Sequence, residues 1–157
     1  MEAPPEPYAL ETAEGRSIDL GEGFVVTVKA DEHQTGGVVS VLETQEPPGF
    51  GPPLHVHHDC AEAFYVLDGE YEMYLDDREV VCGPGSFVFV PRGVRHGFRT
   101  GEVTGRKLNF YFPASMIGYF DELSAVLRQE DVGEDELAQL AARHGMEIVG
   151  PPSERYV

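Results

Sequence analysis

The densest group of metal-binding side chains lies in the stretch LHVHHDCAEAF, residues 54–64. It contains three of the chain's six histidines, and Glu62 follows them closely. His55 and His57 are separated by one residue, so in an extended chain both point to one side and His58 points to the other. Imidazole nitrogens beside a carboxylate oxygen are ligands for divalent iron, manganese, nickel, cobalt, copper or zinc. The stretch therefore predicts a site for one such metal, whose identity the ligand types leave open.

A fourth candidate ligand, His96, ends the stretch GSFVFVPRGVRH, residues 85–96. The spacings of the two stretches resemble the two motifs of the cupin superfamily. The first motif, a glycine, His-x-His, a glutamate and a second glycine, is matched by Gly49, His55, His57, Glu62 and Gly69. The second motif, a glycine, Pro-x-Gly and a histidine, is matched by Gly85, Pro91, Gly93 and His96. The resemblance is close over residues 49–100, except that Thr100 stands where the motif usually has asparagine.

This resemblance implies an all-β fold, a small jelly-roll barrel, that holds one metal through His55, His57, Glu62 and His96. The remaining coordination positions would be open to water, substrate or dioxygen. Three neutral imidazoles and one carboxylate leave a divalent ion with a net charge near +1, which favours an anionic oxygen ligand from the substrate. We expect His58 to face solvent and Cys60 to be a loop residue.

Runs of β-branched and aromatic residues, separated by glycine-rich turns, predict the strands that would position these ligands. The predicted strands are at 23–30, 36–44, 62–68, 71–76, 78–82, 86–91, 95–100 and 106–112. Short strands at this spacing are typical of a barrel or a double-sheet jelly roll.

Beyond Pro113 the apolar residues change to a helical period, with Met116, Phe120, Leu123 and Leu127 on one face and Ser115 as the N-cap. A second short helix contains Leu137, Leu140 and Ala141 and would end at Gly145. The sequence thus divides into a flexible acidic and proline-rich arm (1–16), a cupin barrel (17–113) and a helical extension packed on the barrel (114–157).

The same alternation predicts which side chains line a substrate pocket. Phe64 and Val66 share the face of Glu62, and Phe98 shares the face of His96. From the last strand either Phe110 and Phe112 or Asn109 and Tyr111 point inward. We take the phenylalanines as the inward pair, which gives a lining of Phe64, Val66, Phe98, Phe110 and Phe112. Inward aromatics in a small barrel also serve simply as core. If they do line a pocket, it suits an apolar or aromatic small molecule better than a sugar phosphate, for which arginine or lysine would be expected.

Composition excludes several classes of partner. The chain has 157 residues and a net charge of −17, so it is the size of one domain and would be repelled by nucleic acids and by anionic membrane surfaces. No apolar run is long enough to span a membrane, and the amino terminus has no signal peptide, so we expect a cytoplasmic protein with free Cys60 and Cys82 thiols. The resemblance and the unburied helical stripe favour a homodimer.

The sequence leaves three hypotheses on function open. The chain resembles single-domain bacterial cupins that are similar to quercetin dioxygenases, which implies a dioxygenase in which Glu62 is both a metal ligand and the catalytic base for a substrate hydroxyl. The second hypothesis is a non-redox metal-dependent cyclase, isomerase or dehydratase of secondary metabolism. The third is a small-molecule-binding cupin without catalysis.

Overall fold

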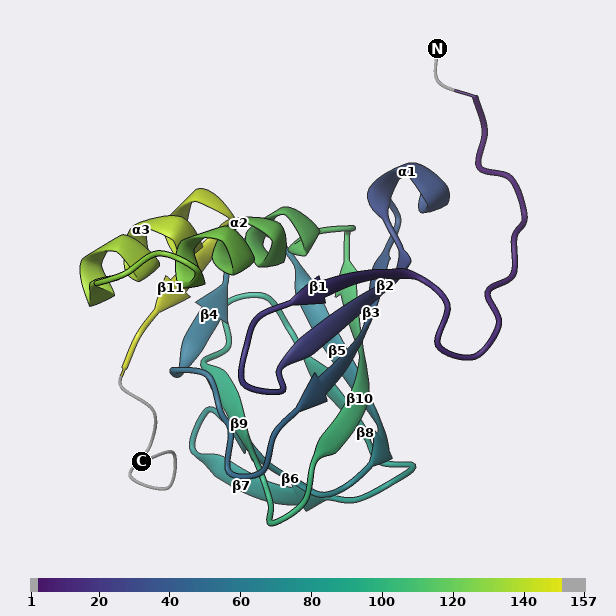
Figure 1. Ribbon diagram of the computed structural model, residues 1–157. Coiled ribbons are helices and arrows are strands. Elements are labelled where there is room, and N and C mark those ends of the chain that lie inside the picture. Colours follow the sequence, from purple (N-terminus) through teal and green to yellow (C-terminus); the bar gives the residue numbers. More distant parts are fainter. Residues whose placement is uncertain (1–2, 151–157) are drawn as a thin grey trace.

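Two antiparallel sheets enclose the interior of the protein (Figure 1). The computed structural model describes residues 3–150. The six-stranded sheet has the order β1 (Arg16–Asp19), β2 (Val25–Ala30), β3 (Ser40–Glu46), β10 (Gly105–Phe112), β5 (Ala61–Asp68) and β8 (Phe87–Val90). The five-stranded sheet has the order β11 (Met146–Ile148), β4 (His55–His57), β9 (His96–Thr100), β6 (Tyr71–Leu75) and β7 (Arg78–Cys82). The predicted all-β jelly-roll architecture is confirmed.

Strand alternation fills the interior from both sheets. Buried positions recur at every second residue of β3 and β10, and the positions between them are more exposed. One apolar cluster, which includes Phe64, Val66, Tyr71, Met73 and Phe98, fills the half of the interior away from the helices. A second cluster joins β1 and β2 to the helices through residues such as Val26, Leu42, Phe120 and Ala141.

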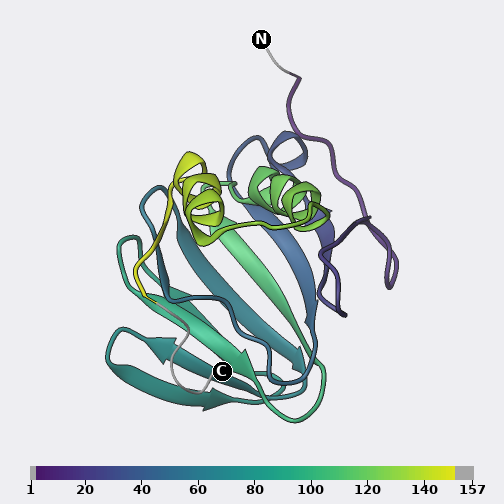
Figure 2. The ribbon, with the colours of Figure 1, turned by 60° about the vertical axis from the view of Figure 1, so that its left-hand side comes forward.

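Two helices, α2 (Ile117–Leu127) and α3 (Glu134–Arg143), cover one end of the sheets (Figures 1 and 2). Phe120 of α2 and Ala141 of α3 are buried in one apolar cluster with strand residues, and Leu140 of α3 is also buried. The N-cap of α2 is Met116 rather than the predicted Ser115, because Ser115 exchanges backbone hydrogen bonds with the Ser40 hydroxyl and is thereby tied to β3. None of the helices within residues 3–150 is long and apolar enough to cross a membrane.

Three elements depart from the predicted pattern. A four-residue helix, α1 (Glu32–Thr35), lies between β2 and β3, where the sequence predicts no helix. It is fixed by a capping box between Asp31 and Gln34 and ended by Gly36 at φ 64°. The sequence predicts no strand at β1, which begins at Arg16, the last residue assigned to the arm, and none at β11. Residues 1–2 of the predicted arm and 151–157 of the predicted extension lie outside the described part of the chain.

Candidate metal centre

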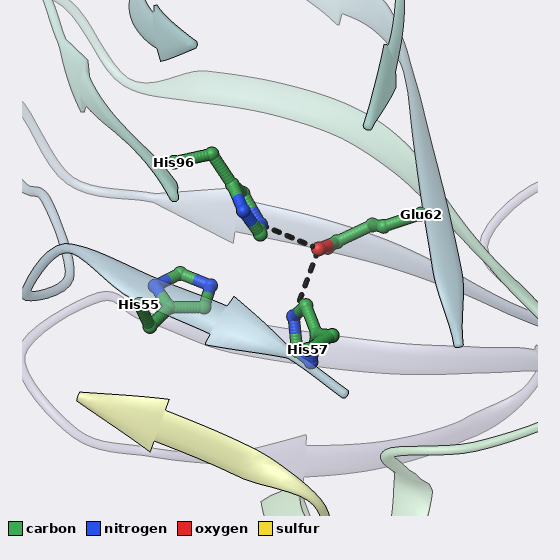
Figure 3. Close-up of side chains that lie close together, drawn as sticks. All are labelled: His55, His57, Glu62 and His96. Atoms are coloured by element: carbon green, nitrogen blue, oxygen red, sulfur yellow. Dashed lines mark hydrogen bonds and ion pairs between the residues drawn. The ribbon is translucent and has the colours of Figure 1, made fainter. Parts of the chain in front are cut away.

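Four buried side chains converge between the two sheets (Figure 3). His55 and His57 come from β4, His96 from the neighbouring β9, and Glu62 reaches across from β5 of the other sheet. Their ligand atoms all lie within 4.8 Å of one another. The structure thus brings together the four residues that the sequence predicted as ligands, and within residues 3–150 no other group of histidine, cysteine and acidic side chains has this arrangement.

Hydrogen bonds fix the orientation of the imidazole rings. His55 Nδ1 lies 2.8 Å from the Pro53 carbonyl oxygen, and His96 Nδ1 lies 2.9 Å from the Val94 carbonyl oxygen. Because a carbonyl can only accept, both Nδ1 atoms carry the proton. In the neutral tautomer the Nε2 lone pair is therefore free to bind a cation, which is the arrangement usual for metal-binding histidines.

Glu62 forms the centre of the group. Its Oε2 lies 2.9 Å from His57 Nε2 and 3.0 Å from His96 Nε2 (Figure 3). Burial by itself would raise the pKa of Glu62, but the adjacent His57 and His96 outweigh it and hold this pKa well below the usual range. The side chain is therefore a carboxylate at neutral pH.

The same surroundings shift the pKa values of His55 and His96 in opposite directions. Burial, reinforced by the neighbouring His96 and His57, lowers the pKa of His55 to about 3. Burial also acts to lower the pKa of His96, but the hydrogen bond and charge of Glu62 outweigh it and raise this pKa above its ordinary value. Without a cation, His96 uses its Nε2 proton to bind Glu62. A divalent ion would take the place of such protons between the rings and the carboxylate.

These observations agree with the chemistry of a metal site. The donor set comprises three imidazole nitrogens and one carboxylate oxygen, all buried, with two rings oriented by backbone carbonyls. His57 Nδ1 is buried and has no hydrogen-bond partner among the described residues. The four residues fit a divalent transition metal, and the donor types suit iron, manganese, nickel, cobalt, copper or zinc.

Two neighbouring residues lie outside the group. His58 is exposed and its Nε2 lies 2.8 Å from Glu147 Oε2, as expected for a side chain of the opposite parity. Cys60 lies in the loop between β4 and β5, as predicted, and its side chain is buried in the apolar cluster that includes helix α2. Burial, with the charge of Glu62, raises the pKa of its thiol to about 11. Both cysteines are free, as the sequence predicted.

A cavity of about 550 Å³ opens beside the metal centre. His55 and His57 line it, together with aromatic walls that include Phe24, Phe50, Phe98 and Phe120. Of the five residues predicted to line a pocket, only Phe98 does so. Phe64 and Val66 point into the barrel as expected, but they pack in the apolar core behind Phe98.

The prediction that Phe110 and Phe112 line the pocket is wrong. Their rings stack on the outer face of the sheet, with centroids 6.3 Å apart, and Phe112 is 40% exposed. The reason is the register of β10 against β5, in which Tyr111 lies directly opposite Glu62. Residues directly opposite each other in an antiparallel pair point to the same face, so Tyr111 and Asn109 point inward with Glu62.

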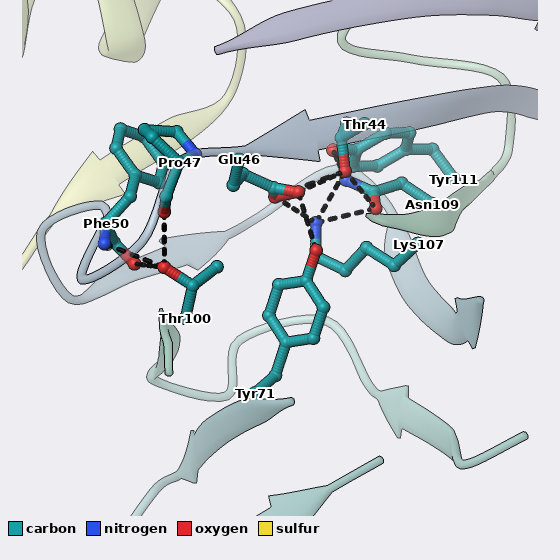
Figure 4. Close-up of polar contacts among 9 residues, drawn as sticks. All are labelled: Thr44, Glu46, Pro47, Phe50, Tyr71, Thr100, Lys107, Asn109 and Tyr111. Atoms are coloured by element: carbon teal, nitrogen blue, oxygen red, sulfur yellow. Dashed lines mark hydrogen bonds and ion pairs between the residues drawn. The ribbon is translucent and has the colours of Figure 1, made fainter. Parts of the chain in front are cut away.

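Sequence reasoning missed a buried polar cluster, which comprises Thr44, Glu46, Tyr71, Lys107 and Asn109 (Figure 4). Lys107 Nζ donates to Thr44 Oγ1 at 2.9 Å, to Glu46 Oε2 at 3.0 Å and to Asn109 Oδ1 at 2.9 Å. The Tyr71 hydroxyl donates to the other oxygen of Glu46 at 2.9 Å. A lysine therefore does line the cavity, contrary to the apolar lining predicted, although its charge is paired with that of Glu46.

The unusual Thr100 has a structural role. Its hydroxyl donates to the Pro47 carbonyl at 2.6 Å and accepts from the Phe50 amide at 2.8 Å (Figure 4). Phe50 is one of the aromatic walls of the cavity. Threonine at this position thus holds the loop that carries a cavity wall and has no part in the metal centre.

Comparison with known proteins agrees with this architecture. A family model described as Cupin domain matches residues 41–106, which include all four candidate ligands. Residues 41–106 are therefore a cupin domain. Over 93 residues this cupin is 34% identical to quercetin 2,3-dioxygenase of Bacillus subtilis (strain 168). The match covers 59% of this chain but spans only 27% of the length of that relative.

Solved structures show the same fold at low identity. An RmlC-like cupin from Shewanella frigidimarina superposes with a TM-score of 0.61 at 20% identity, covering 73% of this cupin and 96% of that chain. The polyketide cyclase RemF from Streptomyces resistomycificus superposes with a TM-score of 0.60 at 20% identity, covering 88% of this cupin and 94% of that chain. At this identity the likeness establishes the fold and not the activity.

Proposed function

We propose that this cupin is a metal-dependent dioxygenase that acts on an aromatic or enol-type small molecule. The observation that carries the proposal is the position of the buried His55, His57, Glu62 and His96 group beside a cavity with aromatic walls. The similarity to a quercetin 2,3-dioxygenase supports the same chemistry. In such a reaction both atoms of dioxygen enter the product, so no external reductant is required.

Metal binding, proton transfer and substrate binding would fall to different side chains. A metal held by the four ligands would supply a Lewis acid and, if redox-active, a route for electrons to dioxygen. Glu62 is ionised and lies beside the cavity-lining His57, so it can accept the proton of a substrate hydroxyl within hydrogen-bond reach. Phe50 and Phe98 would hold an aromatic ring and exclude water from the reacting atoms.

The test combines elemental analysis with an oxygen electrode. Protein purified without added metal is analysed for its metal content, and oxygen consumption is then measured with a panel of flavonols and catechols. We expect a redox-active metal and substrate-dependent oxygen uptake. Zinc as the native metal, or the absence of oxygen uptake across the panel with iron, manganese, nickel, cobalt and copper each supplied, would refute the dioxygenase.

One observation favours a second candidate, a non-redox cyclase. The match to the polyketide cyclase RemF covers nearly the whole of both chains, whereas the match to the dioxygenase covers about a quarter of that protein. In a cyclase the metal would act only as a Lewis acid, and Glu62 would again move a proton. Turnover of a polyketide-like substrate by the zinc form, without oxygen uptake, would support this candidate.

A further inference from the structure

The cavity of this cupin has polar groups in two places. His55 and His57 line it at the metal centre, and Thr44, Glu46, Lys107 and Asn109 of the buried polar cluster line it as well. The aromatic side chains described above line the same cavity. A concave apolar pocket with a few converging polar groups is the usual form of a site that fixes the orientation of a ligand.

Strand β10 gives the distance between the two places. Tyr111 lies opposite Glu62 and marks the level of the metal centre. Asn109 and Lys107 point to the same side of β10 and follow at intervals of two residues. At about 3.4 Å per residue, Asn109 lies about 7 Å and Lys107 about 14 Å along the strand from that level.

Hydrogen-bond capacity separates Asn109 from the other members of the cluster. The Lys107 ammonium has three protons, and all three have acceptors, in Thr44, Glu46 and Asn109. The single Thr44 hydroxyl proton is donated to Glu46 at 2.8 Å. Neither side chain has a donor left for a ligand.

Asn109 is different because Lys107 fixes the orientation of its amide. With Oδ1 held by the ammonium, the Nδ2 group must be on the other side of the amide. Its one hydrogen bond within residues 3–150 is long, 3.5 Å to the Tyr111 hydroxyl oxygen. An amide nitrogen carries two protons, so at least one N–H remains to donate to a ligand in the cavity.

We infer that Asn109 binds a second oxygen of the substrate, and that Lys107 is a positioning residue that holds the Asn109 amide in the donating orientation. The substrate class is then a molecule of two or three linked or fused rings, with one oxygen at the metal centre and another acceptor oxygen about 7 Å further along β10. The oxygen at the metal centre rests on the proposed function, whereas the second oxygen rests on the buried polar cluster.

A pair of flavonols tests the inference by binding alone. Quercetin carries hydroxyls on its outer rings, whereas 3-hydroxyflavone has the same ring system and the same 3-hydroxyl but none of the others. Dissociation constants for both are measured by fluorescence titration with protein loaded with zinc, which is redox-inert, so that no turnover occurs. We expect quercetin to bind about 10-fold more tightly than 3-hydroxyflavone, the discrimination typical of a hydrogen bond to an aligned donor.

Two substitutions at Asn109 and one at Thr44 distinguish ligand binding from support of the fold. Asn109→Asp keeps an acceptor for Lys107 but removes the N–H donors, and Asn109→Leu removes both functions. Thr44→Val is the matched control, because it also deprives Lys107 of one acceptor but removes no donor that faces a ligand. We expect both Asn109 variants to reduce the preference for quercetin to within about 2-fold and Thr44→Val to keep it.

Each other result overturns the inference. These are equal binding of the two flavonols to the wild type, no binding of either flavonol, an unchanged preference in Asn109→Asp, or an equal loss in Thr44→Val. Oxygen uptake plays no part in this test. A quercetin preference that depends on Asn109 in a protein without oxygen uptake would therefore retain the second oxygen site and reject the dioxygenase.

Discussion

His55 and His96 face each other directly across the β4–β9 pair, with their ring centroids 4.4 Å apart. Two imidazolium cations at this distance would repel each other strongly in a buried site. The lowered pKa of His55 keeps one of the two rings neutral at physiological pH. Burial, reinforced by the neighbouring His96 and His57, therefore holds this metal ligand in its neutral, binding form before any cation arrives.

Single alanine substitutions test the ligand set. Replacing His55, His57 or His96 should remove most of the bound metal, since each change leaves too few ligands to compete with buffer. His58→Ala is the control and should keep its metal, because this side chain is exposed and bonds to Glu147. The metal-to-protein ratio after dialysis is the measurement, and a loss that follows His58 instead of His57 would contradict the site.

The role of Glu62 as a base is tested by Glu62→Gln. Glutamine keeps an oxygen ligand of similar size but removes the charge and the basicity, so an appreciable part of the metal should remain while turnover falls by about 10²-fold or more. In a cupin that only binds its ligand, the same change should alter affinity modestly. Turnover at the wild-type rate by a fully loaded variant would leave Glu62 as a ligand alone.

The metal-free protein should become less stable as the pH is lowered, because of His55. The unfolded chain binds a proton at this residue near its ordinary pKa of 6.5, whereas the folded chain does so only near 3. Proton uptake therefore favours the unfolded state as the pH falls below 6.5, by about 2 kcal/mol between pH 7 and pH 5. His96 acts in the opposite direction, because its raised pKa lets the folded chain bind this proton more tightly: it adds some stability as the pH falls from 7 towards 6 and changes nothing further well below 6.5.

Glu62 should also make the folded chain less stable as the pH is lowered, but in a more acidic range. Its pKa is depressed in the folded chain, so stability is lost as the pH falls past 4.5. Urea denaturation of chelator-treated protein at pH 7 and pH 5 measures the effect. His55→Gln should show a smaller difference between the two pH values, and a wild type that is more stable at pH 5 would contradict the assignment.

The buried Lys107–Glu46 ion pair should contribute to the stability of the fold independently of the metal. Lys107→Met leaves the Glu46 carboxylate buried without its cation and should lower the free energy of unfolding by about 3 to 5 kcal/mol. The double variant Lys107→Met, Glu46→Gln removes both charges but keeps an acceptor for Tyr71, so it should recover much of that loss. Equal destabilisation of the single and double variants in urea titrations would contradict a paired buried charge.

The four ligands could be predicted because their spacings resemble the two cupin motifs, and strand parity supports the choice of histidines in the first motif. His55 and His57 differ from His58 in strand parity, and the glycine and proline turns fix where the strands begin. The cavity lining was harder to predict, because alternation states that Phe110 and Asn109 face opposite ways but not which of them faces inward. Only the register of β10 against β5, a contact distant in the sequence, decides this.

Lys107 illustrates a second limit of sequence reasoning. A lysine in a strand usually marks an exposed position, since burial of an ammonium is costly. Here the acceptors that make burial tolerable, Thr44 and Glu46, come from β3 far away in the sequence. Thr44 and Glu46 are two residues apart, as are Lys107 and Asn109. This equal spacing is the feature of the sequence that could have indicated the buried cluster.

The pairing of β4 with β11 bears on the order in which the protein becomes functional during synthesis. The strand that carries His55 and His57 pairs with β9 on one side through His55 and His96, and on its other side with Met146–Ile148. A ribosome-bound chain that ends before Met146 already contains all four metal ligands but lacks the neighbour that holds β4 in place. Capture of the metal at full affinity should therefore wait until β11 has emerged from the ribosome.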